Sequence, residues 1–419
     1  MSYLNYCDAL KKFELENLYA ELGESPGPVL VRVDINVPVN KDTRRISRNP
    51  YNLRLENYSY AIDLYSSLAP VVVMAHQGRN DGKDINFIDL RDHAIALGTM
   101  MHNGRVMYER EIEGEDYFSR RLAKEIKSLE KGDVLLLENV RKFDFEEKFD
   151  AQTCPYIPFF KKAGIEACIN DGLPVWHRAN ASAMALPYIA PTHIGLISAK
   201  ELETQHKIMH DSGKKTIIIG GMKPKFAAIP KLAEKMDILT GGLTGQMVCK
   251  LKGYDLGNKN NEFLEKTYKQ NEIEMLRPIV NKYEIATPID FVASINGDDK
   301  IVSVDELKGT DYFINDIGPS TVDKYATDIA EGSYDWKIRG GPNGRYEWGY
   351  NNGVKLIRRI LGSGFVAVGG DTVEELQNAG LCKPIAATGG HVLLGGGAHL
   401  DGWAGEPYPS IEEIIKIQV

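Results

Sequence analysis

The segment from Val29 to Pro38, VLVRVDINVP, indicates the fold expected for this chain. It begins with a short run rich in β-branched residues, which has the length of a buried strand. Polar side chains follow directly after that run. Similar short runs recur along the chain, and a longer amphipathic stretch follows each one. They occupy residues 71–74, 134–137, 216–219 and 365–368. This alternation predicts βα units, in which helices cover both faces of a parallel sheet.

Length and composition limit the class of protein. A chain of 419 residues exceeds what one hydrophobic core usually serves, so two domains are expected. The net charge of -8 argues against nucleic acid or an anionic membrane as a partner. The five cysteines are scattered without a CxxC pair, and no apolar run approaches 18 residues. We therefore expect a cytoplasmic protein that is a monomer or a small homo-oligomer.

A polar, helix-forming segment at residues 197–211 interrupts the βα pattern. We expect the domain boundary there. The predicted organisation is an N-terminal domain at 1–196, an interdomain helix at 197–213, a C-terminal domain at 214–394 and a last segment at 395–419. We expect that last segment to form a connection followed by a short helix and to return toward the N-terminal domain.

Polar side chains follow the first predicted strand. Asp34 and Asn36 occupy alternate positions of an extended segment, so both are expected to face one side and could hold hydroxyl groups of a ligand. A strand-end turn explains the same residues, because Asx residues before a proline favour turns. The motif therefore needs partners from elsewhere in the chain.

Basic side chains follow the later strands of the first half. Ligands of open parallel sheets bind at the carboxyl ends of the strands, so these side chains are expected to converge. Guanidinium groups bind phosphate and carboxylate through paired hydrogen bonds, which predicts a receptor for a small anion that carries both groups. A single arginine alone would be interpreted as a solvated surface residue, and a lone histidine as a buried residue with its hydrogen bonds satisfied. The candidates are Arg54, His76, Arg79, Arg141, His177 and Arg178.

The second half contains glycine-rich strand ends but neither a GxxxxGK[ST] nor a GxGxxG pattern. Glycines allow a close approach of the backbone to phosphate, and a nearby carboxylate can hold Mg²⁺ carried by a nucleotide. We therefore expect a phosphate site. Its candidate loops are Gly220–Gly221, Gly241–Gly242, Gly369–Gly370–Asp371–Thr372 and Gly395–Gly396–Gly397.

These segments resemble, in order from residue 29 to residue 398, the signatures of the phosphoglycerate kinase family. LTGGLTG is more similar to the archaeal branch of that family. The segments are VLVRVDINVP, MAHQGR, LLENVR, NDGLPVWHRANAS, IIIGGMK, LTGG, ATPIDF, NDIGPSTV, GGPNGRYEW, VGGDT and HVLLGGGA.

The resemblance implies two doubly wound, Rossmann-like α/β domains joined by a helical hinge. The N-terminal domain would bind 3-phosphoglycerate, and the C-terminal domain would bind ATP or ADP with Mg²⁺. The enzyme would transfer a phosphoryl group reversibly between ATP and 3-phosphoglycerate, with a hinge motion that closes the domains. The implied substrate-binding residues are Asp34, Asn36, Arg54, His76, Arg79, Arg141 and Arg178.

The resemblance also implies roles in catalysis and in nucleotide binding. Lys223 would lie near the transferring phosphoryl group, Glu347 would bind the ribose and Pro342 the adenine side. Asp371 would hold the magnesium ion. The implied catalytic residues are Arg54, Lys223, Gly370 and Gly396. The implied nucleotide-binding residues are Gly220, Gly221, Lys223, Gly241, Gly242, Pro342, Glu347, Gly369, Gly370, Asp371 and Thr372.

The chain departs from the family pattern in its second half. Gly340 replaces an asparagine, and Leu393 and Leu394 replace a pair of hydroxyl side chains. We expect weaker nucleotide binding from these changes. Two alternatives stay open: a related kinase that acts on another phosphorylated carboxylate, and a non-catalytic, anion-binding regulatory protein.

Overall fold

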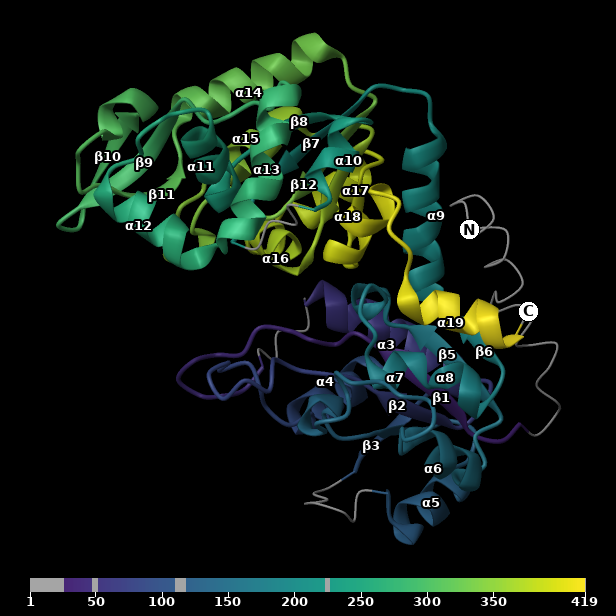
Figure 1. The fold of residues 1–419 in the computed structure, drawn as a ribbon. Helices are drawn as coiled ribbons and strands as arrows, with labels where there is room; N and C mark the ends of the chain where they lie inside the picture. The colour runs from purple at the N-terminus through teal and green to yellow at the C-terminus, as the bar shows by residue number, and fades with distance from the viewer. Residues whose placement is uncertain (1–25, 47–51, 110–117, 223–226, 419) are drawn as a thin grey trace. The chain divides into compact units, whose positions relative to one another are not determined.

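A computed structural model describes residues 26–46, 52–109, 118–222 and 227–418. The described residues divide into two compact units (Figure 1). Unit 1 contains the chain up to His206 together with the segment from Pro407 onward, and unit 2 contains Lys207–Glu406. The domain boundaries expected at residues 196 and 213 stay a prediction.

Unit 1 contains a parallel sheet of six strands in the order β3-β4-β2-β1-β5-β6. Its strands are β1 (Val29–Val33), β2 (Val71–Met74), β3 (Arg105–Tyr108), β4 (Asp133–Leu136), β5 (Ala167–Asp171) and β6 (Thr192–Ile194). Its helices are α3 (Leu53–Ser66), α4 (Arg91–Met100), α5 (Arg120–Lys127), α6 (Tyr156–Ala163), α7 (Ala181–Met184), α8 (Leu186–Ile189) and α19 (Pro409–Gln418), with 3-10 turns η2 (Val140–Lys142) and η3 (Leu173–Val175).

Successive side chains along each strand of unit 1 point to opposite faces of the sheet, so apolar side chains lie on both faces. Leu30, Val72 and Leu135 belong to one buried cluster, which includes apolar residues of α5 and α6. Helix α3 contacts β2 and β4 and buries residues such as Leu55 and Ile62. The order of the strands reverses beside β1, which makes the carboxyl end of this strand the expected position for a ligand.

Unit 2 contains a second parallel sheet, of five strands in the order β14-β13-β12-β7-β8. Its strands are β7 (Lys215–Ile219), β8 (Asp237–Thr240), β12 (Trp336–Gly340), β13 (Phe365–Val368) and β14 (His391–Leu393). Its helices are α10 (Ile229–Ala233), α11 (Gly242–Leu251), α12 (Asn258–Thr267), α13 (Gln270–Lys282), α14 (Pro319–Gly332), α15 (Asn352–Ile360), α16 (Gly370–Asn378), α17 (Cys382–Ala387) and α18 (Gly397–Trp403), with 3-10 turns η4 (Val304–Leu307) and η5 (Tyr346–Trp348). Helix α9 (Leu196–His210) crosses from unit 1 into unit 2.

The two faces of this second sheet also belong to different buried clusters. Ile217 and Ile338 lie in a cluster that includes apolar residues of α11 and α13. Ile218 and Ala367 lie in a cluster with apolar residues of α14 and α15. The carboxyl ends of all five strands lie along one edge, because every neighbouring pair is parallel.

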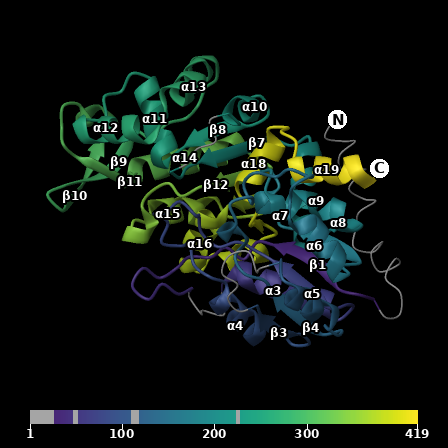
Figure 2. The same ribbon diagram turned by 60° about the horizontal axis from the view of Figure 1, so that its bottom comes forward.

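A small antiparallel sheet in unit 2 was not predicted from the sequence. It consists of β10 (Asp298–Ser303), β9 (Asp290–Ile295) and β11 (Phe313–Ile317), in that order. Figure 2 shows it next to α11 and α12. Asn296 and Gly297 join β9 to β10 with positive φ angles of 54° and 92°. An Asn-Gly pair is a strong hairpin signal, so the sequence did contain the information.

The expected α/β class with parallel sheets is confirmed, and the five predicted strands are present with ends shifted by at most one residue. The connection expected after residue 394 was incomplete, because α18 lies within it before the last helix, α19. Among the described residues, no helix is long and apolar enough to cross a membrane.

Candidate active site

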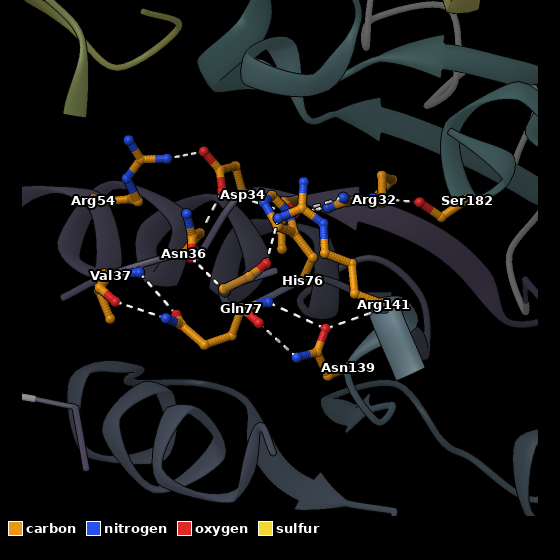
Figure 3. A network of polar contacts seen from close by, with 12 residues as sticks. Arg32, Asp34, Asn36, Val37, Arg54, His76, Gln77, Asn139, Arg141 and Ser182 are labelled. Carbon is orange, nitrogen blue, oxygen red and sulfur yellow. Dashed lines mark hydrogen bonds and ion pairs between the residues drawn. The ribbon is translucent and has the colours of Figure 1, made fainter. Parts of the chain in front are cut away.

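Arg54 and Asp34 form an ion pair at the carboxyl end of β1 (Figure 3). Asp34 follows the strand directly and is buried. Arg54 lies in the first turn of α3, where the Asn52 side chain caps the helix by accepting hydrogen bonds from the Arg54 and Leu55 N–H groups at 3.1 and 3.2 Å. The cap fixes the start of α3 and therefore the position from which the guanidinium group reaches Asp34.

Asn36 ties the end of β1 to the loop after β2. Its side-chain oxygen accepts a hydrogen bond from the Gly78 N–H group at 2.9 Å. Gln77, in the same loop, accepts from the Val37 N–H group and donates to the Val37 carbonyl at 2.9 and 2.8 Å. Asn139, after β4, donates to the Gln77 carbonyl at 2.8 Å. Side-chain amides thus join three loops at this edge of the sheet (Figure 3).

His76 is buried among positive charges. Its Nδ1 atom lies 3.0 Å from an Arg32 guanidinium nitrogen and 4.0 Å from an Asp34 carboxylate oxygen. Burial, followed by the charges of Arg141 and Arg32, holds the pKa of His76 well below its usual range. The imidazole is therefore neutral at physiological pH, and it can donate a hydrogen bond without adding charge.

Arg141 lies in the 3-10 turn after β4 and is also buried. Its guanidinium group donates to the Gly78 carbonyl. Burial, together with the charges of Arg178 and Arg32, lowers the pKa of Arg141 to about 10. Mutual repulsion among buried arginines is relieved when an anion binds, so this arrangement favours an anionic ligand.

Arg178 lies at the rim of the group formed by Arg32, His76 and Arg141, and Arg79 follows Gly78 in the loop after β2. Arg79 and Arg178 are both exposed. The Arg79 N–H group donates to Asp84 at 2.9 Å, and the Arg178 side chain donates to His177 at 3.2 Å. The charge of Arg178 contributes to the lowered pKa values of Arg141 and His76. The structure thus brings Asp34, Asn36, Arg54, His76, Arg141 and Arg178 into one region, and their role in binding a substrate stays a prediction.

Arg32 is the residue of this region that sequence reasoning missed. It lies inside β1 and is only 1% exposed, yet it donates to Ser182, to the Val33 carbonyl and to His76. A charged residue within an otherwise apolar strand run was the available signal, because a buried arginine requires polar partners. Gln77 and Asn139 were also not selected as site residues.

The glycine pairs of unit 2 pack loops against one another. Gly220 and Gly221, after β7, donate to the carbonyls of Gly340 and Pro342 at 2.8 and 2.6 Å. After β8, Gly241 donates to Ile219 at 2.9 Å.

Side chains on these glycines would collide with the neighbouring loop. A Cβ atom on Gly220 would collide with the Pro342 carbonyl oxygen, and one on Gly242 would lie 2.9 Å from the Gly221 nitrogen. Close backbone packing therefore accounts for these glycines.

The start of α16 offers a different environment. Gly370 and Asp371 are exposed in its first turn, where the N–H groups of a helix favour anions. Thr372 is buried, and its hydroxyl accepts a hydrogen bond from the Gly341 N–H group at 2.8 Å. A Cβ atom on Gly369 would lie 3.6 Å from the Cα atom of Gly396, which places the loops after β13 and β14 side by side.

The two residues predicted to contact the nucleoside differ in their exposure to solvent. Pro342 is buried, and Glu347 is exposed in the turn η5. Lys223, predicted as a catalytic residue, lies outside the described residues. Across the part of the chain that is described, no three His, Cys, Asp or Glu side chains converge on a metal position. Asp371 is compatible with a single oxygen contact to a magnesium ion that a nucleotide carries.

The departures from the family pattern also have a structural context. Gly340 ends β12, and a Cβ atom there would lie 3.7 Å from Leu400, which is an ordinary contact. Leu393 and Leu394 are both buried, and Leu393 belongs to the larger apolar cluster of unit 2. Leu393 therefore occupies apolar surroundings.

The fold and the site define an α/β protein with a buried basic cluster at one parallel sheet edge and glycine-rich loops at another. The family model for phosphoglycerate kinase matches residues 25–406. The chain therefore belongs to the phosphoglycerate kinase family, which consists of phosphotransferases.

Named relatives support this assignment. The chain is 30% identical to the phosphoglycerate kinase of Pyrococcus abyssi, covering 92% of this chain and 94% of that protein. It is 29% identical to the phosphoglycerate kinase of Sulfolobus acidocaldarius, covering 92% of each. The crystal structure of the Pyrococcus horikoshii phosphoglycerate kinase matches with a TM-score of 0.77 and 28% identity, covering 97% of this chain and 98% of that chain. The expected similarity to archaeal members is confirmed, and nothing in these comparisons supports the alternative functions.

Proposed function

We propose that this chain catalyses reversible phosphoryl transfer between ATP and the carboxylate of 3-phosphoglycerate, which yields ADP and 1,3-bisphosphoglycerate. The observation that carries the proposal is the basic cluster beside β1, formed by Arg32, Arg54, His76 and Arg141. It matches a small ligand that carries both a phosphate and a carboxylate. The activity named for the archaeal relatives supports the same reaction.

The reaction requires little covalent chemistry from the protein. The substrate carboxylate attacks the γ-phosphoryl group in line, and the protein contributes positioning and charge stabilisation. Arg141 and His76 bind the phosphoglycerate, with Arg79 and Arg178 at its exposed side. Arg54 and Lys223 neutralise the transferring group.

The nucleotide is proposed to bind unit 2. Gly370 and Asp371 at the start of α16 receive its phosphates, while Pro342 and Glu347 contact the nucleoside. Magnesium, held in part by Asp371, would supply charge neutralisation of the phosphates. We also propose a cytoplasmic location, a monomer or small homo-oligomer, and a hinge motion that excludes water during transfer.

A coupled assay tests the proposal. The purified chain is incubated with 3-phosphoglycerate, magnesium and each of several nucleoside triphosphates, and formation of the acyl phosphate is followed by its reductive consumption. We expect activity that requires 3-phosphoglycerate, with ATP as a substrate. Activity only with another phosphorylated carboxylate would support the paralogous kinase. Binding of the anion without turnover under any nucleotide would support the non-catalytic alternative.

A further inference from the structure

A buried chain of polar contacts extends from His76 away from the predicted substrate-binding residues. Arg32 links His76 to Ser182 on α7, since its NH2 lies 3.0 Å from His76 Nδ1 and its Nε donates to Ser182 Oγ at 2.8 Å. Ser182 then contacts Glu146 twice, because its hydroxyl and its N–H group donate to the two carboxylate oxygens at 2.6 and 3.0 Å. All four side chains are buried, and Figure 3 shows the part from His76 to Ser182.

Arg32 determines which nitrogen of His76 carries the proton. A guanidinium group has only donors and stays protonated in proteins. The Nδ1 atom at 3.0 Å must therefore accept, and in a neutral imidazole the proton then lies on Nε2. Asp34 does not compete for Nδ1, because it lies 4.0 Å away and its charge is paired with Arg54.

Glu146 and Ser182 determine where Arg32 lies. The charge of Glu146 faces that of Arg32 across the Ser182 hydroxyl. This hydroxyl accepts from Arg32 and donates to Glu146, so its orientation is fixed at both ends. Burial raises the pKa of Glu146 to about 7, while the charge of Arg32 and the two Ser182 hydrogen bonds favour the ionised form. In its ionised form the Glu146 carboxylate offsets the buried positive charge of Arg32.

We propose that Glu146 and Ser182 are positioning residues which, through Arg32, hold His76 as the Nε2–H tautomer that donates to the anionic substrate. The inference about the substrate rests on the proposed function. The inference about the tautomer rests only on the contacts described above. Neither Glu146 nor Ser182 touches the substrate in this proposal; both act through Arg32.

The tautomer is measured by NMR on protein with ¹⁵N-labelled histidine, without substrate. The His76 signals are assigned by their loss in His76→Gln. We expect the parent to show a protonated Nε2 and an unprotonated Nδ1 at neutral pH. Ser182→Ala and Glu146→Gln should each give a mixture of tautomers, because the Arg32 contact to Nδ1 loosens. A parent His76 that is protonated on Nδ1 would overturn the proposal.

Kinetics supply the second readout. In the same two variants we expect the KM for 3-phosphoglycerate to rise about two- to tenfold, as for one lost hydrogen bond, with kcat changed by less than about twofold. Ser66→Ala is the matched control, since Ser66 is a fully buried serine of unit 1 that only bonds a carbonyl of its own helix.

The outcomes separate the two proposals. A control with the same rise in KM, or variants with parental tautomer and KM, would show that Glu146 and Ser182 are only structural. A parent that is inactive with 3-phosphoglycerate but has the Nε2–H tautomer would refute the proposed function and leave the tautomer assignment standing. Thermal melts identify any variant that fails to fold, and the parent tautomer then still decides the assignment.

Discussion

The two parallel sheets use their carboxyl edges differently. In unit 1, polar side chains hold one another in place, as in the pair of Arg54 with Asp34 and the contact of Arg32 with His76. In unit 2, glycine backbones hold the loops together, as where Gly220 donates to the Gly340 carbonyl. Ion pairs and side-chain amides therefore connect the loops of the first edge. Close glycine packing connects those of the second edge, where one buried ion pair, Arg339 with Glu375, also lies. Substitutions should act on ligand binding and turnover in unit 1, and on packing in unit 2.

The largest effect is expected for Arg54→Ala. Loss of charge stabilisation at a transferring group typically costs about 10² to 10³ in rate, so we expect kcat to fall at least a hundredfold. The variant also leaves buried Asp34 without its ion pair, so turnover is measured well below the melting temperature and circular dichroism checks the fold. Arg91→Ala, at an exposed arginine of α4, is the control. A kcat within threefold of the parent would contradict the role of Arg54.

The substrate-binding arginines should affect affinity. Replacing Arg79, Arg141 or Arg178 with alanine removes charge-assisted hydrogen bonds, which are worth roughly 1.5 to 3 kcal/mol each. Because Arg141 is buried and the other two are exposed, we expect the largest loss for Arg141→Ala. Calorimetric titration with 3-phosphoglycerate measures this. Unchanged affinity in all three variants would show that the basic cluster serves another ligand.

The sequence predicted the strands well, and also those candidate site residues that come soon after a short apolar run. The strands at 29–33, 71–74 and 365–368 have the predicted bounds, because a buried parallel strand reads as one apolar run. Asp34 follows such a run directly and His76 follows one after a single residue, so their convergence could be expected. Arg32 could not be placed in this way, because its partner Ser182 is 150 residues away in the chain. A single sequence does not reveal such a pairing.

The sequence also did not reveal the close packing of the loops in unit 2. The glycines of unit 2 were interpreted as places where phosphate approaches the backbone. Gly220 and Gly242 also approach other loops, and the phosphate contact stays a prediction. Both explanations call for a missing side chain, so residue type alone cannot separate them. The hairpin at Asn296–Gly297 was different, since its signal is local and was overlooked.

Two glycine-to-alanine substitutions test whether close backbone packing limits which side chains unit 2 can accept. In Gly220→Ala the new methyl group meets the Pro342 carbonyl, which is backbone and cannot rotate away. We expect a loss of roughly 1 to 3 kcal/mol in the free energy of unfolding. Gly340→Ala is the matched control, because its nearest neighbour would be Leu400 at 3.7 Å and the effect should stay within about 0.5 kcal/mol. Thermal melts compare the two, and equal shifts would contradict the packing explanation.

The smallest effect is expected where the chain departs from its family. Gly340 and Leu394 stand where the resemblance to the family implies polar side chains, and one ordinary hydrogen bond is worth about 0.5 to 1.5 kcal/mol. We therefore expect a raised KM for MgATP in the parent. In Gly340→Asn we expect MgATP to bind about two- to tenfold more tightly than in the parent, because the strand end has room for a Cβ atom.

The double variant Gly340→Asn with Leu394→Thr should bind MgATP more tightly than the parent, but at a cost in stability. Leu394 is buried, so a threonine hydroxyl there loses apolar contacts and needs a hydrogen-bond partner. Calorimetry with MgATP on the parent, the single and the double variant separates the two residues, and thermal melts report the stability. Tight MgATP binding by the parent, with no gain in Gly340→Asn, would show that other groups of unit 2 already replace the missing contacts.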